Sequence, residues 1–249
     1  METIKKLIKT ILIPFLGPIS LLRLMELFGQ KSTHGFPNIN KELWFKLFSK
    51  SKKNIRFVQI GANDGVKNDP IHAYIRQQGW QGVLVEPIPA IFEELKQNYE
   101  GVPNLIFEMV GIADTDGSLD FYHLAPEFDD PNWLQQIGTF DRKAIEFNLA
   151  VRPDLLPHIT STEIPTVSLK TLFSRNHIDQ LDILLLDVEG LEWVILKQLQ
   201  GLTIRPQYLF FEWGCMAQND LNDLLQLLQT NGYSLYSCGG DMLATRNAS

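Results

Sequence analysis

Cysteine is scarce in this chain of 249 residues, which contains only Cys215 and Cys238 and no pair in CxxC spacing. Two thiols are too few for a disulfide scaffold or a thiolate zinc site. Free thiols suit a reducing compartment. We therefore expect a cytoplasmic protein.

Clustered positive charge is lacking as well. The formal net charge is −7, and the densest basic run consists of Lys50, Lys52 and Lys53. A surface that follows the phosphates of a nucleic acid needs grouped lysines and arginines, so we expect no nucleic-acid partner. Hydrophobic residues make up 45% and charged residues 20% of the chain, which is the balance of an ordinary globular protein.

The N-terminal segment lacks an apolar run of the length that crosses a bilayer. Its apolar part, Ile11–Leu22, reaches about half of the ~20 residues that a spanning helix needs, and Pro14 and Pro18 disfavour one continuous helix. We predict that residues 1–30 form a helical arm appended to a single domain of residues 31–249. The arm would pack on that domain, form a homodimer contact or, through the lysines beside its apolar face, touch a membrane surface.

From residue 55 onward, apolar strands alternate with amphipathic helices, which is typical of an α/β fold with a mostly parallel sheet and helices on both faces. We expect the two final strands to form an antiparallel edge, and Asp69 and Gly79 to bound the second helix. The expected strands are 55–60, 82–86, 104–110, 118–124, 182–187, 207–212, 233–237 and 242–245, and the expected helices are 37–49, 70–78, 89–100, 141–150, 191–199 and 219–230.

A glycine-rich turn, QIGANDG, runs from Gln59 to Gly65 directly after the first strand of this alternation. Gly61 and Gly65 allow the backbone to approach a ligand closely, and such turns lie at the carboxyl edge of a doubly wound sheet, where ligands bind. Glu86 ends the next strand, in the position of an acidic residue that accepts hydrogen bonds from ribose hydroxyls. Together these features indicate a nucleoside site.

The type of nucleoside follows from two missing motifs. The dinucleotide pattern GxGxxG is absent, because Asn63 replaces the glycine that approaches a pyrophosphate, and the P-loop lysine is absent too. A ligand with adenosine but without phosphate, such as S-adenosylmethionine, fits better. A nucleotide-dependent dehydrogenase is the rival enzyme, and an Asx turn of Asn63 and Asp64 that binds no ligand is the structural alternative.

Five blocks follow one another along the chain: FVQIGANDG (57–65), VLVEPIP (83–89), GIADTDG (111–117), IPTVSLKTL (164–172) and LLLDVEGLEWVIL (184–196). In this order they resemble the FkbM family of methyltransferases, and the DVEG block is the most specific of them. The resemblance implies a Rossmann-like class I methyltransferase fold for the domain and S-adenosylmethionine as cofactor. It also implies O-methylation of a hydroxyl on a saccharide or a secondary metabolite, so the expected partner is a small-molecule or glycan acceptor.

The resemblance also assigns cofactor-binding residues by position. Gly61, Asn63 and Gly65 lie beside the methionine portion, Glu86 holds the ribose, and the segment 111–113 flanks the adenine. Many members carry Asp where this chain has Gln59, and an amide lacks the charge that attracts the cofactor's ammonium group, so we expect modest affinity. The complete set is Gln59, Gly61, Asn63, Asp64, Gly65, Glu86, Gly111, Ile112, Ala113 and Asp187.

Carboxylates at two further strand ends are the candidates for catalysis. Asp187 and Glu189 belong to the DVEG block, and Glu212 ends the strand that follows. Asp187 and Glu212 could hold Mg²⁺ or another divalent cation, or Asp187, Glu189 or His123 could act as a metal-free general base. Alternatively, Asp187 caps the next helix, and Glu189 and Glu192 favour its positive first turn.

Residues 125–162 interrupt the alternation with a loop rich in Pro and Asp and one expected helix. The loop contains Phe128, Trp133 and Phe140, so we predict that the segment is a lid on the acceptor side. A protein of the same fold that binds the cofactor without turnover is the rival that is not an enzyme.

Overall fold

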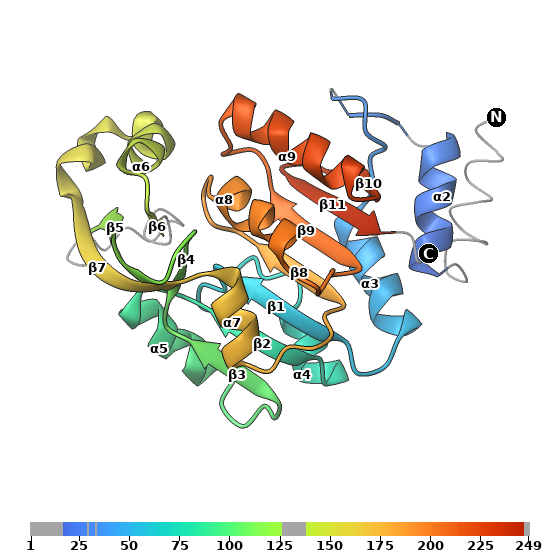
Figure 1. The fold of residues 1–249 in the computed structure, drawn as a ribbon, viewed down its shortest axis with the longest axis horizontal. Helices are drawn as coiled ribbons and strands as arrows, with labels where there is room; N and C mark the ends of the chain where they lie inside the picture. Colours follow the sequence, from blue (N-terminus) through green and yellow to red (C-terminus); the bar gives the residue numbers. More distant parts are fainter. Residues whose placement is uncertain (1–16, 29, 33, 126–137, 247–249) are drawn as a thin grey trace.

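The computed structural model describes residues 17–28, 30–32, 34–125 and 138–246, and these form a large and a small β-sheet with surrounding helices (Figure 1). The strands are β1 (Arg56–Ile60), β2 (Gln81–Val85), β3 (Leu105–Glu108), β4 (Gly111–Ile112), β5 (Gly117–Leu124), β6 (Gly138–Thr139), β7 (Ile159–Val167), β8 (Ile183–Leu186), β9 (Tyr208–Glu212), β10 (Tyr233–Cys238) and β11 (Asp241–Arg246). The helices are α2 (Pro18–Phe28), α3 (Lys41–Ser51), α4 (His72–Gln78), α5 (Pro89–Asn98), α6 (Arg142–Asn148), α7 (Leu169–Arg175), α8 (Glu192–Leu196) and α9 (Gln218–Thr230), with short 3₁₀ turns η4 (Leu149–Val151), η5 (Pro153–His158) and η6 (Lys197–Gly201).

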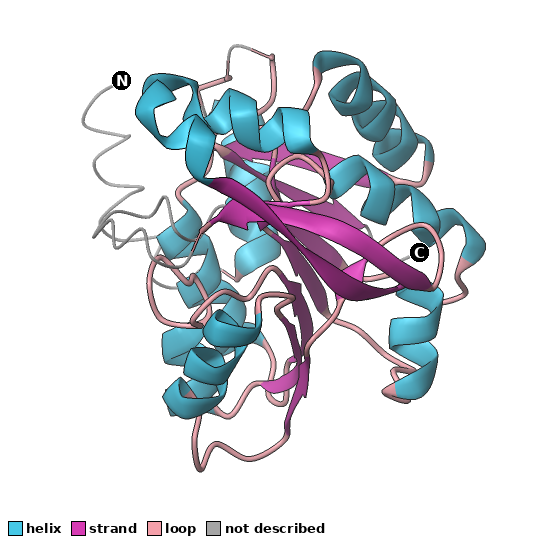
Figure 2. Cartoon of the chain, turned by 90° about the vertical axis from the view of Figure 1, so that its left-hand side faces the viewer, coloured by secondary structure: helices cyan, strands magenta, loops and turns pink. Residues whose placement is uncertain are grey.

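The large sheet has seven strands in the order β10-β11-β9-β8-β1-β2-β3, and β1 pairs in parallel with both β2 and β8. Helices cover both faces of this sheet (Figure 2), and its central strand β8 is apolar along its whole length, as expected of a strand buried on both faces. One buried cluster joins the sheet to α2, α3, α4 and α5, and a second joins its other face to α7, α8 and α9. The predicted α/β class, with helices on both faces, is confirmed.

The last two strands pair antiparallel across a turn at Gly239 and Gly240, as predicted. β11 also pairs antiparallel with β9, so the reversed strand lies one position inside the edge and β10 is the outermost strand. Gly239 has a φ of +81°, a left-handed conformation that glycine adopts without steric cost.

The small sheet has the order β4-β7-β5-β6 and lies to one side of the large one, in green and yellow in Figure 1. The strand predicted at 118–124 belongs to this sheet, as β5. β7 was not predicted, although it pairs with β5 along the whole of that strand. Its sequence ITSTEIPTV contains a proline and buries only part of one face, so it carries neither a continuous apolar run nor a clean alternation.

The segment predicted as a lid is described only in part. Residues 126–137, with Phe128 and Trp133, lie outside the described residues. The remainder forms β6, α6, the turns η4 and η5 and the start of β7. Asp141 caps α6 by accepting a hydrogen bond from the Lys143 backbone N–H, so the helix expected at 141–150 is present in shortened form.

The described end of the predicted arm is α2, which packs against α3. Leu21 and Leu22 of α2 are buried in the cluster beneath α3, and residues 1–16 lie outside the described part. α3 begins at Lys41 with Asn40 as its cap, four residues later than the predicted start at Pro37. None of the described helices has the length and apolarity that a bilayer crossing requires.

Candidate cofactor and acceptor site

A cavity of about 420 Å³ opens at the carboxyl ends of β1, β2, β8 and β9. Its volume lies within the ~300–1,000 Å³ that is common for small-molecule sites, and its position is the ligand-binding edge of a doubly wound sheet. Of the residues predicted for the site, those that line the cavity are Gln59, Gly61, Asn63, Glu86, Gly111, Ile112, Asp187, Glu189 and Glu212.

Strand alternation places the polar residues of the site on one side of the sheet. Successive side chains of a strand point to opposite faces, and Phe57, Leu185 and Phe210 all pack into the cluster beneath α3 and α4. Gln59, Asp187 and Glu212 each follow one of these residues at a spacing of two. They therefore share the α3 side, and their carboxylate and amide groups converge on one cavity.

Gly61 and Gly65 are required by the packing of the chain on itself. A Cβ on Gly61 would stand 1.9 Å from the carbonyl oxygen of Asp187, and one on Gly65 would stand 2.4 Å from Cε2 of Tyr99 and 2.6 Å from Cδ1 of Leu95. Both residues have positive φ. Both glycines stand where a close approach of the backbone was predicted, but the groups that approach them belong to the chain itself, and Gly65 does not line the cavity.

The turn also contains the predicted Asx geometry. Asn63 Oδ1 accepts a hydrogen bond from the Asp64 backbone N–H at 2.6 Å. Asp64 Oδ1 accepts from the N–H groups of Val66 and Lys67, both at 2.9 Å. Asp64 is buried and does not line the cavity, so its carboxylate shapes the turn beside the site.

Glu86 is buried at the end of β2 and is held by backbone donors. Its Oε2 accepts from the Asn63 N–H at 3.0 Å, and its Oε1 accepts from the Ile88 N–H at 2.9 Å. Burial raises the pKa of Glu86 to about 7, these two hydrogen bonds oppose the rise, and the charge of Asp187 adds to it. Each carboxylate oxygen has a second lone-pair site, so both can still accept a ligand hydroxyl.

Gln59 presents an unsatisfied acceptor to the same cavity. The side chain is 7% exposed, and its Oε1 is buried without a hydrogen-bond partner among the described residues. Leaving such a group unpaired costs about 1–3 kcal/mol. An orphaned oxygen in the wall of a ligand-sized cavity therefore fits a ligand that brings a donor.

Asp69 lines this part of the cavity as well. Its Oδ1 accepts from the N–H groups of Ile71 and His72 at 2.7 and 3.1 Å and so holds the turn before α4. The predicted cap is displaced, because the N-terminal cap position is Ile71 and α4 begins at His72, after Pro70. Burial raises the pKa of Asp69 to about 6 against the two backbone hydrogen bonds. A cap of the second helix was the only role predicted for Asp69.

Three carboxylates follow one another across the far end of the cavity. Asp187 follows β8, Glu212 ends β9, and Asp241 pairs with Glu212 in the β9–β11 register. Asp187 is exposed to the cavity, but protein surrounds it, and this desolvation, with the charge of Asp241, raises its pKa to about 6. Burial likewise raises the pKa of Glu212 to about 7, and the charge of Asp187 adds to it.

Lys41 is the cation at this end of the cavity that the sequence argument missed. It begins α3, and its Nζ lies 2.8 Å from Oδ2 of Asp241. Nothing in the local sequence distinguishes it from other helix-terminal lysines. Its role depends on the contact between α3 and β11, which are 200 residues apart in the chain.

Glu192 lies in the first turn of α8, as predicted, and has a further role in the DVEG turn. It is fully buried, and it accepts hydrogen bonds from the N–H groups of Val188 at 3.2 Å and Gly190 at 3.1 Å. These two hydrogen bonds stabilise the backbone of the DVEG turn. Burial raises the pKa of Glu192 to about 8. The N-terminal cap position of α8 is Leu191, without a side-chain hydrogen bond, so the alternative that Asp187 caps this helix is wrong.

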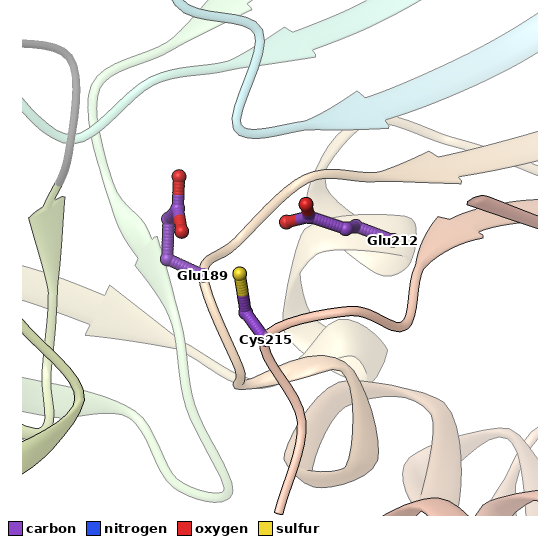
Figure 3. A group of neighbouring side chains, drawn as sticks. All are labelled: Glu189, Glu212 and Cys215. Carbon is purple, nitrogen blue, oxygen red and sulfur yellow. The ribbon is translucent and has the colours of Figure 1, made fainter. Parts of the chain in front are cut away.

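Glu189, Glu212 and Cys215 point toward one another at the acidic end (Figure 3). Their ligand atoms all lie within 4.8 Å of one another, so among the described residues this trio could hold a metal ion. The predicted metal ligands were Asp187 and Glu212, and the trio contains Glu212 but not Asp187. Burial and the neighbouring carboxylates raise the pKa of the Cys215 thiol far above its ordinary value. A protonated thiol is a hydrogen-bond donor and a poor metal ligand.

His123 and Ala113, which were predicted for the site, do not line the cavity. His123 lies on β5, with Nδ1 at 2.8 Å from the Leu124 carbonyl oxygen and Nε2 at 2.9 Å from Thr162 Oγ1. The Ala113 N–H donates to the Val167 carbonyl oxygen at 3.0 Å. Both residues therefore serve the small sheet.

The small sheet contributes an aromatic pair to the wall beside Gly111. Phe121 and Phe140 meet edge to face at 5.0 Å between ring centroids, and both line the cavity. A Cβ on Gly111 would stand 2.1 Å from Cζ of Phe140. Phe140 was predicted as part of the lid, and its contact with Gly111 brings that segment against the residues expected at the adenine.

The order of the large sheet, its reversed strand β11 and the cavity at its carboxyl edge define a Rossmann-like class I methyltransferase fold. The sequence model of the methyltransferase FkbM domain matches residues 59–235, which is more than half of the chain. The chain therefore belongs to the FkbM methyltransferase domain family. None of the curated proteins matches it.

Solved structures that match the chain include methyltransferases of low sequence identity. A methyltransferase FkbM from Methylobacillus flagellatus KT has a TM-score of 0.49 and 11% identity, with 85% of this chain and 49% of that chain covered. The METTL16 methyltransferase domain has 0.45 and 13%, covering 83% and 66%. Fibrillarin of Aeropyrum pernix, with natively bound S-adenosyl-L-methionine, has 0.42 and 10%, covering 78% and 67%. This chain spans about half the length of the Methylobacillus protein.

Proposed function

We propose that this protein is an S-adenosylmethionine-dependent O-methyltransferase that acts on a hydroxyl of a saccharide or a secondary metabolite. The observation that carries the proposal is Glu86, whose buried carboxylate ends β2 in a cavity that belongs to a methyltransferase domain. The acceptor class follows from the family resemblance. The protein would work in the cytoplasm, with residues 1–30 available for a membrane surface or a second subunit.

The residues of the cavity fit this cofactor in three places. Gln59 offers an unpaired acceptor to the methionine portion, together with the backbone of Gly61 and Asn63. Glu86 accepts hydrogen bonds from the ribose hydroxyls. Gly111 and Ile112 flank the adenine. When bound, the cofactor supplies an electrophilic methyl group on a sulfonium.

The chain's remaining task is to make the acceptor hydroxyl nucleophilic. Asp187 is the favoured general base, because it is exposed to the cavity and burial raises its pKa to about 6. A base with a pKa near the working pH is efficient at accepting a proton. Glu189 borders the same space and is the second candidate, whereas the described contacts of His123 lie away from the cavity.

A metal-assisted route is the alternative for this step. Glu189 and Glu212, which belong to the trio that could hold a metal ion, and Asp187, which borders the same cavity, are carboxylates suited to a divalent cation such as Mg²⁺. A cation held there would lower the pKa of the acceptor hydroxyl. The two routes need the same negative charge and differ in their response to chelators.

The direct test is transfer of a radiolabelled methyl group from S-adenosylmethionine to panels of saccharides and hydroxylated secondary metabolites. Label in an O-methyl product, with S-adenosylhomocysteine formed in equal amount, would support the proposal. Binding of S-adenosylmethionine without transfer to any acceptor would favour the cofactor-binding protein without turnover. Binding of NADH in its place would favour the dehydrogenase and reject the proposal.

A further inference from the structure

The part of the cavity that is expected to hold the methionine portion must accommodate a positive charge, and residue 59 supplies no negative charge to balance it. The cofactor's amino-acid portion has an ammonium group at neutral pH, and Gln59 offers it only a neutral carbonyl oxygen. A carboxylate adds a Coulomb attraction to the ammonium group that a neutral amide oxygen does not supply. A carboxylate close to Gln59 would therefore strengthen binding of this ligand.

Asp69 is the carboxylate that the fold brings to Gln59. Both residues line the cavity, and the Gln59 side chain lies close enough to lower the pKa of Asp69. The N–H groups of Ile71 and His72 fix Oδ1 of Asp69, and the Tyr99 hydroxyl lies 3.4 Å from Oδ2. The carboxylate is thus held in one orientation before any ligand binds.

The charge of Asp69 is not neutralised by a neighbouring lysine or arginine. Among the described residues no salt bridge involves Asp69, whereas its neighbour Lys67 pairs with Asp64 at 3.3 Å. The hydrogen bonds that Asp69 accepts come from neutral donors. Apart from His72, whose charge lowers the pKa of Asp69, no described cationic group acts on this carboxylate. A half-buried carboxylate without a salt bridge among the described residues, in the wall of a cavity, is complementary to a cationic ligand group.

We propose that Asp69 binds the ammonium group of the cofactor and supplies the negative charge that Gln59 lacks, while Gln59 Oε1 accepts a second hydrogen bond from the same group. This inference rests on the proposed binding of S-adenosylmethionine. It assigns to the residue that holds the turn before α4 a second role as a cofactor-binding residue.

The experiment compares two ligands by calorimetry. S-adenosylhomocysteine carries the ammonium group, and 5′-methylthioadenosine keeps the adenosine and the sulfur but lacks the amino-acid portion. Asp69→Asn keeps an oxygen for the two backbone donors and removes the charge. We expect Asp69→Asn to bind S-adenosylhomocysteine about ten- to a hundredfold more weakly and to bind 5′-methylthioadenosine as the wild type does.

Asp64→Asn is the matched control, because Asp64 also accepts two backbone N–H groups but does not line the cavity. It should leave the ratio of the two affinities unchanged. In the Asp69→Asn background, Gln59→Glu should restore binding of S-adenosylhomocysteine by returning the charge to the adjacent position.

Equal weakening of both ligands by Asp69→Asn, or no weakening of either, would overturn the inference and leave Asp69 with a role only in the turn before α4. A wild-type protein that binds 5′-methylthioadenosine and S-adenosylhomocysteine equally well would also overturn it, with the nucleoside site intact. Failure of the wild type to bind S-adenosylmethionine and both of these ligands would instead reject the proposed function on which the inference rests.

Discussion

Gly61 lies so close to Asp187 that a Cβ at position 61 would stand 1.9 Å from the Asp187 carbonyl oxygen. This contact joins the turn after β1 to the start of the DVEG segment, and the two segments form adjoining walls of the cavity. The cavity therefore requires glycine at position 61, because a side chain at this position would push the two walls apart.

We expect Gly61→Ala to destabilise the fold by about 2–4 kcal/mol, the combined cost of a left-handed non-glycine residue and of overpacking. Gly79→Ala is the control, since Gly79 has a φ of +67° and a Cβ added there would meet no heavy atom within 4 Å. It should cost only the conformational part, about 1–2 kcal/mol. Urea denaturation of the two variants measures the difference, and equal losses would mean that the contact with Asp187 relaxes freely.

Glu86→Ala should weaken binding of S-adenosylhomocysteine about ten- to a hundredfold, because charge-assisted hydrogen bonds to the ribose contribute about 1.5–3 kcal/mol. The same loss should apply to 5′-methylthioadenosine, which retains the ribose, and this separates Glu86 from Asp69. Calorimetry with both ligands checks the expectation. Unchanged affinity for both would show that Glu86 only organises the turn through Asn63 and Ile88.

Much of this arrangement could be predicted from the sequence, because its signals are local. The apolar runs of β1, β8 and β9 and the polar residues at their ends placed Gln59, Asp187 and Glu212 at one edge of the sheet. Those runs are apolar and largely buried, so tertiary contacts do not override them.

The remainder depends on contacts between distant segments. β7 was missed because its pairing with β5, and not its own pattern, makes it a strand. Lys41 and Asp69 gained their positions in the cavity from the packing of α3 and α4 on the sheet. The glycines were recognised, but the groups that they approach, such as the Asp187 carbonyl and Tyr99, come from elsewhere in the chain.

Glu192 should make the free energy of unfolding fall as the pH rises. Burial raises its folded-state pKa from the ordinary 4.5 to about 8, so between these values the folded state holds a proton that the unfolded state releases. Stability then decreases with pH by up to about 1.4 kcal/mol per unit. Glu86 and Glu212, with pKa values of about 7, act in the same direction.

Denaturation curves at pH 5, 6, 7 and 8 measure this slope. Glu192→Gln removes the titrating group and keeps one acceptor for the N–H groups of Val188 and Gly190, so the variant should show a smaller loss between pH 5 and pH 8 than the wild type. Identical slopes in the two proteins would mean that Glu192 is already ionised in the folded state.

Asp187→Asn should abolish most turnover while leaving the fold nearly as stable as the wild type. Asp187 is exposed to the cavity and does not cap α8, so the amide removes negative charge and little else. General-base groups contribute roughly 10²–10⁴-fold to rates, and a loss of that order in methyl transfer is expected, with the melting temperature as the stability check.

Chelation then separates the two routes. Activity that is lost with EDTA and restored by Mg²⁺ or Mn²⁺ would indicate a cation held by Asp187 and Glu212. Activity that is unaffected by EDTA would indicate a metal-free base. Normal turnover by Asp187→Asn would exclude Asp187 from both routes and leave Glu189, which borders the same cavity, as the carboxylate to test next.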